Sequence, residues 1–243
     1  MMGGNDLKHF MSHPRCRVVA ICDVNRRHIE QAAALLPKAR RYSDWREMLR
    51  QEGDKIDSVS VTVPDHMHAA ITMAALRAGK HVYCQKPPCH DVAECRAVTR
   101  AAASGVVTQL GTQYASSVGA RQAVKWLREG MIGKARRVIL CANRVGAEKY
   151  RLLGPRPPAG SPPPDTLAWD LWLGTAPERP FVPDIYHPVS WRAWQDFGTG
   201  WSGDIGCHIF DAVWKGLDLH APLSITAEVQ ESWRQSPARR ADT

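Results

Sequence analysis

The sequence lacks long apolar runs, a secretion leader and paired cysteines. Its longest apolar run, around Val18 to Cys22, is far shorter than the about 20 residues that a membrane span needs. Met1 is followed by Gly-Gly-Asn-Asp, and not by a basic and then apolar leader. The seven cysteines contain no Cys-x-x-Cys pair, so neither a disulfide scaffold nor a zinc cluster is expected. These absences predict a cytoplasmic protein without a metal or a membrane partner, and leave open whether an export signal once preceded Met1.

Positive charge is plentiful but has no pattern. The formal net charge is +8 at pH 7, with Lys and Arg dispersed over the chain and only small pairs such as Arg136-Arg137. The sequence has no basic stripe interleaved with aromatic residues and no helix-turn-helix pattern. We therefore expect no nucleic-acid partner, and an anionic small ligand suits the charge equally well.

Short β-branched runs alternate with amphipathic segments over the first two-thirds of the 243 residues. This alternation predicts an α/β fold with right-handed βαβ units and a doubly wound parallel sheet. Asp44 with Glu47, and Asp91 with Glu94, have the spacing of capping boxes at two helix starts. The expected strands are 17–22, 56–63, 81–84, 106–110 and 135–143, and the expected helices are 26–36, 44–49, 68–78, 91–104, 118–129 and 206–219.

Proline and tryptophan are concentrated in the second half of the chain. Ten of the 17 prolines lie between Pro155 and Pro188, and six of the nine tryptophans between Trp169 and Trp214. Proline this dense excludes a regular helix and is compatible with a flexible linker. Because large aromatic residues are interleaved with the prolines, we favour an ordered and packed loop.

Asp23 ends the first expected strand. Gly3 and Gly4 lie 20 and 19 residues upstream, where the last glycine of a dinucleotide-binding fingerprint belongs. The first two glycines of that fingerprint, and the strand before them, are not in the chain. An aspartate at this position binds the ribose of a dinucleotide, but it is as often a cap, here for the helix beginning near Arg26. Spacing alone leaves both interpretations open.

A second cluster follows the strand that ends in Val63 and Pro64. The next helix begins with Asp65, His66 and His68 near its start, which places polar groups at the carboxyl edge of the sheet, where ligands bind in such folds. The two histidines are two residues apart and do not share a helix face, so they are poor metal partners. Ordinary helix-start residues are the competing interpretation.

Two further clusters carry acid–base chemistry. Lys86 follows a strand and is held by Pro87, so its ammonium group could polarise a hydroxyl or carbonyl, although Lys-Pro is also a common surface sequence. Asp204 and His208 are four residues apart and share one face if the helix has begun by Asp204. A carboxylate beside an imidazole favours a general base, and a helix cap beside a half-buried histidine is the alternative.

Together these clusters resemble the glucose-fructose oxidoreductase, inositol dehydrogenase and rhizopine-catabolism family (Gfo/Idh/MocA). The resemblance extends from Gly3 to about Leu219. The stretches that carry it are VVAICDVN, VTVPDHMHAAITMAALRAGKHVYCQKP, WLREGMIGKARRV, TLAWDLWLGTAPERPF and WRAWQDFGTGWSGDIGCHIFD.

The resemblance implies an NAD(P)-dependent oxidoreductase acting on a sugar or polyol, and a homo-oligomer when full length. Its Rossmann domain would span residues 1–120, and a C-terminal α/β domain with an open antiparallel sheet residues 121–243. NAD is favoured by Asp23, and Arg26 leaves NADP open. The implied catalytic residues are Lys86, Asp204 and His208; the cofactor-binding residues are Gly3, Gly4, Asp23, Val63, Pro64, Asp65, His68, Gln85 and Lys86; and the substrate residues are Gln113, Trp191 and Arg192.

The chain also departs from the family pattern. Gln85 stands where the family has glutamate before Lys-Pro, and Val63 where it often has threonine. By comparison with the family, the chain is truncated at both ends, so that the Rossmann sheet lacks its first strand and two strands lose their shared neighbour. Two alternatives remain. One is an NAD-dependent glycoside hydrolase of the same superfamily, and the other is a non-catalytic fragment that serves as a binding or assembly module.

Overall fold

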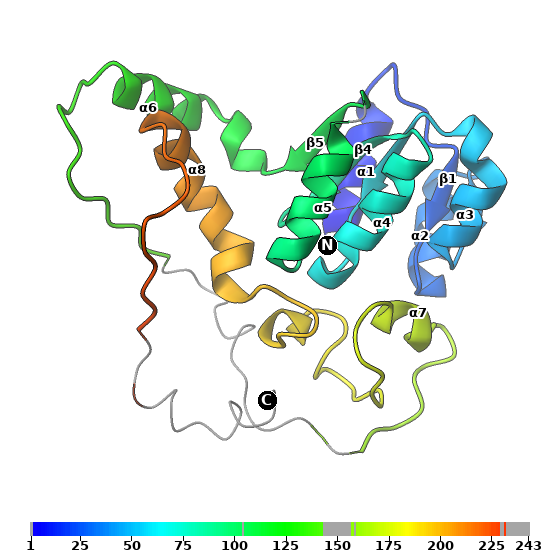
Figure 1. The fold of residues 1–243 in the computed structure, drawn as a ribbon. Helices are drawn as coiled ribbons and strands as arrows, with labels where there is room; N and C mark the ends of the chain where they lie inside the picture. The colour runs from blue at the N-terminus through cyan, green and yellow to red at the C-terminus, as the bar shows by residue number, and fades with distance from the viewer. Residues whose placement is uncertain (1, 104, 143–156, 158, 229–230, 232–243) are drawn as a thin grey trace.

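The computed structural model describes residues 2–103, 105–142, 157, 159–228 and 231 (Figure 1). Its strands are β1 (Ala20–Cys22), β2 (Arg40–Tyr42), β3 (Ser58–Val61), β4 (His81–Gln85) and β5 (Thr108–Gly111). Its α-helices are α1 (Met2–Ser12), α2 (Arg26–Leu35), α3 (Trp45–Glu52), α4 (Asp65–Arg77), α5 (Val92–Ala102), α6 (Val118–Arg128), α7 (Trp169–Leu173) and α8 (Cys207–Gly216). Short 3₁₀ turns span Gly53–Lys55, Gln113–Ser116 and Ser190–Ala193, and a π-helical turn, Ser202–Gly206, precedes α8.

All strand pairs of the sheets are parallel, as the alternation of strands and helices predicts. The strands form two sheets, of order β1-β2 and β3-β4-β5. Figure 1 shows α1 behind the three-stranded sheet and α4 and α5 in front of it, the arrangement of a doubly wound fold. Strands β1 and β3 belong to different sheets, because no described strand pairs with both of them.

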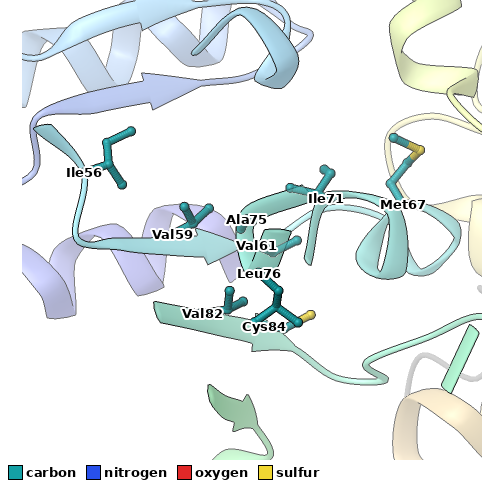
Figure 2. Close-up of a cluster of buried hydrophobic side chains, with 9 residues drawn as sticks. All are labelled: Ile56, Val59, Val61, Met67, Ile71, Ala75, Leu76, Val82 and Cys84. Atoms are coloured by element: carbon teal, nitrogen blue, oxygen red, sulfur yellow. The ribbon is translucent and has the colours of Figure 1, made fainter. Parts of the chain in front are cut away.

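The core of this layer lies between β3, β4 and α4. Val59 and Val61 on β3 pack beside Val82 and Cys84 on β4, and all four side chains are buried (Figure 2). Alternate residues of a strand point to the same face, so these four side chains face one side of the sheet. The α4 residues that complete the cluster are Met67, Ile71, Ala75 and Leu76. Burying each of the larger side chains contributes about 1.5–3 kcal/mol.

Most element boundaries lie within a few residues of those predicted from the sequence. Side-chain caps mark the starts of two helices, α3 and α5. Asp44 caps α3 by accepting a hydrogen bond from Arg46 N (2.8 Å), but Glu47 accepts from Gln51 and does not complete a capping box. At α5, Asp91 accepts from the backbone N–H of Glu94, whose carboxylate reaches back to His90 N. The first predicted capping box is therefore wrong and the second is nearly formed.

Several elements differ from those expected. The sequence patterns did not predict helix α1, the short strand β2 or the short helix α7. The expected strand 135–143 is not formed over its described part, residues 135–142, where Val138, Ile139 and Leu140 are exposed. An apolar run forms a strand only where a neighbouring strand satisfies its backbone groups, and the structure provides none for this segment among the described residues.

The segment rich in proline and tryptophan is packed over its described residues, as predicted. Phe197 and Tyr186 are almost completely buried, and Trp172 packs against Phe197 with ring centroids 4.8 Å apart. Trp169 stacks on Trp172 at 4.8 Å. Aromatic pairs of this geometry stabilise beyond their buried area, which explains how a segment with little regular structure holds one conformation. Residues 155, 156 and 158 of the predicted loop lie outside the described part.

Helices α6 and α8 lie side by side beyond this segment (Figure 1). Their outer surface exposes large apolar side chains, among them Trp126, Phe210 and Trp214. Within the described residues, no helix combines the length and the apolarity needed to cross a membrane.

Candidate functional site

The carboxyl ends of β3 and β4 build the site. The two strands are parallel, with Val61 opposite Cys84, so the segments that follow them leave the sheet at the same edge. Val63 and Pro64 lead into the start of α4, and Lys86 comes directly after β4. This edge carries the second and third clusters predicted from the sequence.

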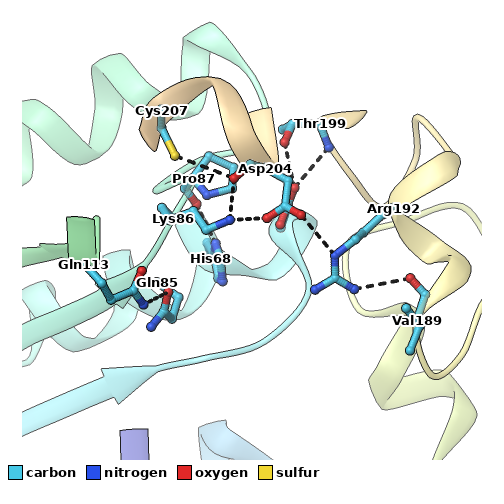
Figure 3. A network of polar contacts seen from close by, with 11 residues as sticks. His68, Gln85, Lys86, Pro87, Gln113, Val189, Arg192, Thr199, Asp204 and Cys207 are labelled. Atoms are coloured by element: carbon cyan, nitrogen blue, oxygen red, sulfur yellow. Dashed lines mark hydrogen bonds and ion pairs between the residues drawn. The ribbon is translucent and has the colours of Figure 1, made fainter. Parts of the chain in front are cut away.

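Lys86 reaches across the chain to Asp204. Its ammonium group donates to the backbone carbonyl of Asp204 (2.5 Å) and to the Asp204 carboxylate, from a position 118 residues away in the sequence (Figure 3). The other carboxylate oxygen of Asp204 lies 3.5 Å from Arg192 Nε. The three side chains are 10–24% exposed, so their charges interact in a partly dehydrated environment. One carboxylate thus holds two cations at the sheet edge.

Arg192 is stacked as well as paired. Its guanidinium group lies 4.2 Å from the centroid of the Trp191 ring, and burial holds the pKa of Arg192 below its usual range while the nearby Asp65 opposes that shift. Trp191 is buried in the aromatic cluster, so Arg192, and not Trp191, faces the site. A guanidinium group held in this way is pre-organised to donate hydrogen bonds to an oxygen-rich ligand.

The start of α4 is tied to the segment before α8. Asp65 is 5% exposed and accepts two hydrogen bonds from Thr199, one from the backbone N (3.0 Å) and one from Oγ1 (2.7 Å). Burial raises the pKa of Asp65, and the Thr199 bonds and His68 oppose this shift. Thr199 was not predicted as a site residue, because a lone threonine in a loop carries no pattern.

His68 completes the α4 side of the site as a neutral imidazole. Burial lowers its pKa, and Nδ1 lies 2.5 Å from the backbone carbonyl of Pro87. A carbonyl only accepts, so Nδ1 carries the proton and Nε2 is an acceptor. Nε2 is buried and forms no hydrogen bond with the described residues. His68 is therefore tied through Nδ1 to the segment that carries Lys86.

Gln85, Gln113 and His208 lie on neighbouring elements. Gln113 Nε2 donates to Gln85 Oε1 (3.1 Å), which links the turn after β5 to the end of β4. His208 lies on the first turn of α8, and its ring packs edge-to-face on Tyr114 at 4.9 Å. Asp204, in the π-helical turn before α8, contacts Lys86 and Arg192.

Asp23 lies apart from this cluster, at the end of β1. Its Oδ1 accepts from Asn25 N (2.8 Å) and its Oδ2 lies 3.1 Å from His28 Nδ1. The cap of α2 is Asn25, which accepts from Arg27 N, so the interpretation of Asp23 as the helix cap is wrong. The Asp23 side chain is 40% exposed, which leaves it accessible to hydroxyl donors.

A nicotinamide dinucleotide fits the described residues at its two ends. The open carboxylate of Asp23 is the acceptor that a ribose requires, and the ammonium of Lys86 lies at the sheet edge where the reacting ring would be placed. Gly3 and Gly4 lie in the first turn of α1, and no strand precedes α1 among the described residues. The same residues contain no group of three or more His, Cys, Asp or Glu arranged to hold a metal ion.

Comparison with known proteins agrees with this architecture. Residues 1–112 match a family model described as "Oxidoreductase family, NAD-binding Rossmann fold", and residues 116–239 match "Oxidoreductase family, C-terminal alpha/beta domain". These matches confirm the expected fold class and the NAD cofactor class.

Curated and solved relatives extend the comparison. Levoglucosan dehydrogenase from Pseudarthrobacter phenanthrenivorans is 29% identical over 171 residues, covering 70% of this chain and 34% of the relative. Inositol 2-dehydrogenase from Klebsiella pneumoniae is 32% identical over 130 residues, covering 52% and 38%. The crystal structure of an oxidoreductase domain protein from Kribbella flavida is 27% identical with a TM-score of 0.60, covering 89% and 51%. The chain thus spans about a third of the length of these curated relatives.

Proposed function

This chain belongs to the Gfo/Idh/MocA oxidoreductase family, and from that premise we propose that it transfers hydride between a sugar or polyol hydroxyl and NAD. The observation that carries the proposal is the Lys86–Asp204 ion pair at the carboxyl edge of the parallel sheet. An ammonium group held there by a carboxylate is placed to polarise a substrate oxygen. The names of the two curated relatives support a sugar or polyol as the substrate.

The chemistry assigns one role to each side chain of the site. Lys86 donates to the substrate oxygen and stabilises the negative charge that develops on it. His208 accepts the hydroxyl proton while the carbon–oxygen double bond forms, and Asp204 orients Lys86 and supports the imidazole. NAD, when bound, accepts the hydride. Arg192 and Gln113 donate to further hydroxyls of the substrate, and the Trp191 ring holds the guanidinium group of Arg192 by a cation–π contact.

The proposed cofactor contacts follow the sheet edge from one end to the other. Asp23 accepts from the ribose hydroxyls, and its negative charge disfavours the 2′-phosphate of NADP, although Arg26 next to the strand end acts in the opposite direction. The remaining proposed contacts are Gly3, Gly4, Val63, Pro64, Asp65, His68, Gln85 and Lys86.

The proposal is tested by following NADH absorbance with a panel of polyols and sugars. We expect Lys86→Ala and His208→Ala to lower turnover at least about 100-fold, the usual contribution of a positioned acid or base. Lys38→Ala is the matched control, because this lysine is exposed and distant in the sequence from the site. Unchanged turnover in Lys86→Ala would contradict the proposal.

The same assay distinguishes the two alternatives. A glycoside hydrolase regenerates its cofactor, so it would release an aglycone without net accumulation of NADH; it is less supported, because both curated relatives named above are dehydrogenases. A binding or assembly module would melt cooperatively, yet show no turnover and no quenching of tryptophan fluorescence when NADH is added.

We also propose a domain boundary near residue 120. The first family match ends at residue 112 and the second begins at residue 116. Helices α6 and α8, which both lie after this point, pack on each other. Limited proteolysis should therefore leave a fragment that ends near residue 120.

A homo-oligomer is proposed from the exposed apolar side chains of α6 and α8. Trp126, Phe210 and Trp214 are 38–49% exposed, and a second copy of the chain would cover them. Trp126→Glu should shift the sedimentation coefficient to that of a smaller species.

A cytoplasmic location is proposed because all seven cysteines, each within the described residues, are free thiols.

A further inference from the structure

Asp6 is a buried carboxylate on helix α1. It is 7% exposed, whereas its neighbours on α1 from Met2 to Asn5 are exposed. One of its oxygens, Oδ2, accepts from Thr62 Oγ1 (2.9 Å) and from Gln85 Nε2 (2.9 Å). The carboxylate therefore joins α1 to Thr62, which follows the end of β3 two residues before Pro64, and to Gln85, which ends β4 directly before Lys86.

The bond to Asp6 determines which way the Gln85 amide points. A carboxylate only accepts, so the NH₂ group of Gln85 must face Asp6 and its carbonyl oxygen must face away. That oxygen accepts from Gln113 Nε2 (3.1 Å). Gly111 on β5 keeps the space for this arrangement, because a Cβ at that position would lie 3.0 Å from the Gln85 amide carbon. Asp6, Gln85 and Gln113 thus form one directed chain of hydrogen bonds.

We propose that Asp6 is a positioning residue, which fixes Gln85 and Gln113 and thereby the strand end from which Lys86 projects. The catalytic consequence rests on the function proposed above. An amide at position 85 and a carboxylate at position 6 form a matched pair. A carboxylate at both positions would bring two like charges within hydrogen-bond distance in a buried place, which is strongly unfavourable.

Thermal melting of a reciprocal set of variants tests the pairing. We expect Gln85→Glu to lower the midpoint by about 5 °C or more, since the variant loses the bond from Gln85 to Asp6 and places two like charges side by side in a buried place. Adding Asp6→Asn to that variant reverses donor and acceptor, and should restore the midpoint to within about 2 °C of the parent. Asn5→Ala, an exposed neighbour on α1, is the control. Additive effects, or a Gln85→Glu variant as stable as the parent, would overturn the pairing.

A kinetic comparison tests the positioning role. Asp6→Ala should lower kcat for the best polyol at least about 10-fold with little change in KM, because the reacting groups are misaligned while binding contacts remain. Asp6→Asn, whose amide oxygen can still accept from Thr62 and Gln85, should keep most of the rate. If Lys86→Ala is inactive and Asp6→Ala has parental kcat, the positioning role fails and the proposed function stands. If Lys86→Ala stays active, the proposed function fails and the pairing is decided by melting alone.

Discussion

His66 is buried without being part of the charged network. Its Nε2 lies 3.2 Å from the carbonyl of Trp172 and 3.1 Å from that of Leu173, and the ring packs on Phe197 with centroids 5.2 Å apart. Burial lowers the pKa of His66 to about 4. The folded protein therefore holds this side chain as a neutral donor at neutral pH.

The free energy of unfolding should consequently depend on pH. Between about pH 6.5 and 4, His66 is protonated in the unfolded chain but stays neutral in the folded chain. The free energy of unfolding is therefore highest above the unfolded pKa of His66. It falls by at most about 3 kcal/mol as the pH decreases through this window. His66→Gln should flatten the profile measured by urea unfolding at several pH values. His68, whose pKa is also lowered, contributes with the same sign, and His9→Gln is the exposed control. An unchanged slope in His66→Gln would contradict the prediction.

Arg179 is a second residue whose role is structural. Its guanidinium group is 3% exposed, pairs with Asp196, and lies 4.6 Å from the ring centroid of Phe197. Removing one partner of such a pair costs about 3 kcal/mol or more, because the other charge loses its counter-ion. Arg179→Ala should show this loss in urea unfolding. Arg26→Ala, in an exposed pair with Glu30, should cost less than about 0.5 kcal/mol.

At the scale of elements, the turn after α7 is set by its contact with α4. Gly174 has φ +53°, and a Cβ there would overlap the side chain of Met67 on α4. Gly133 also has a positive φ, +71°, but open space around it. The pair separates the two costs of adding a methyl group, backbone strain and steric overlap.

Alanine at these two glycines should give unequal losses of stability. Gly133→Ala should cost about 1 kcal/mol from strain alone. Gly174→Ala should cost about 1–3 kcal/mol more, because Met67 must move and α7 with it. Chemical denaturation of the two variants measures the difference. Equal losses would mean that α7 adjusts freely and that its packing on α4 contributes little.

At the scale of the whole molecule, the start of α4 joins the parallel layer to the aromatic segment. Besides the Asp65–Thr199 bonds, His66 N donates to the carbonyl of Phe197 (3.2 Å), and Thr175 Oγ1 donates to the carbonyl of His66 (3.1 Å). Several bonds at one helix start couple the two parts, so we expect them to unfold together.

Two spectroscopic probes can follow this coupling. Tryptophan fluorescence reports mainly the aromatic segment and far-UV circular dichroism reports the helices, and their midpoints should coincide in the parent. In Asp65→Ala the fluorescence midpoint should fall below the dichroism midpoint, because Thr199 loses both bonds. Asp57→Ala, an exposed change in the same layer, should keep them together. Coincident midpoints in Asp65→Ala would exclude this role.

Local signals were enough to predict much of the fold. The alternation of apolar runs and helical periods predicted four of the five described strands, all except β2, and most helices, because side-chain burial follows a period that short segments carry by themselves. The caps Asp44 and Asp91 were readable for the same reason. The segment 135–142 shows the limit of this reasoning, since its apolar pattern has no described strand to pair with.

The sequence by itself determined the parallel α/β layer, the packed aromatic loop and the residue types gathered at the sheet edge. Only the tertiary structure decided which of them meet: Lys86 and Asp204, 118 residues apart, and Asp6 and Gln85, 79 residues apart. Nothing in local composition selects those partners. They depend on how the strand ends and the later helices are placed together, and a buried charge is stable only where that placement supplies its partner.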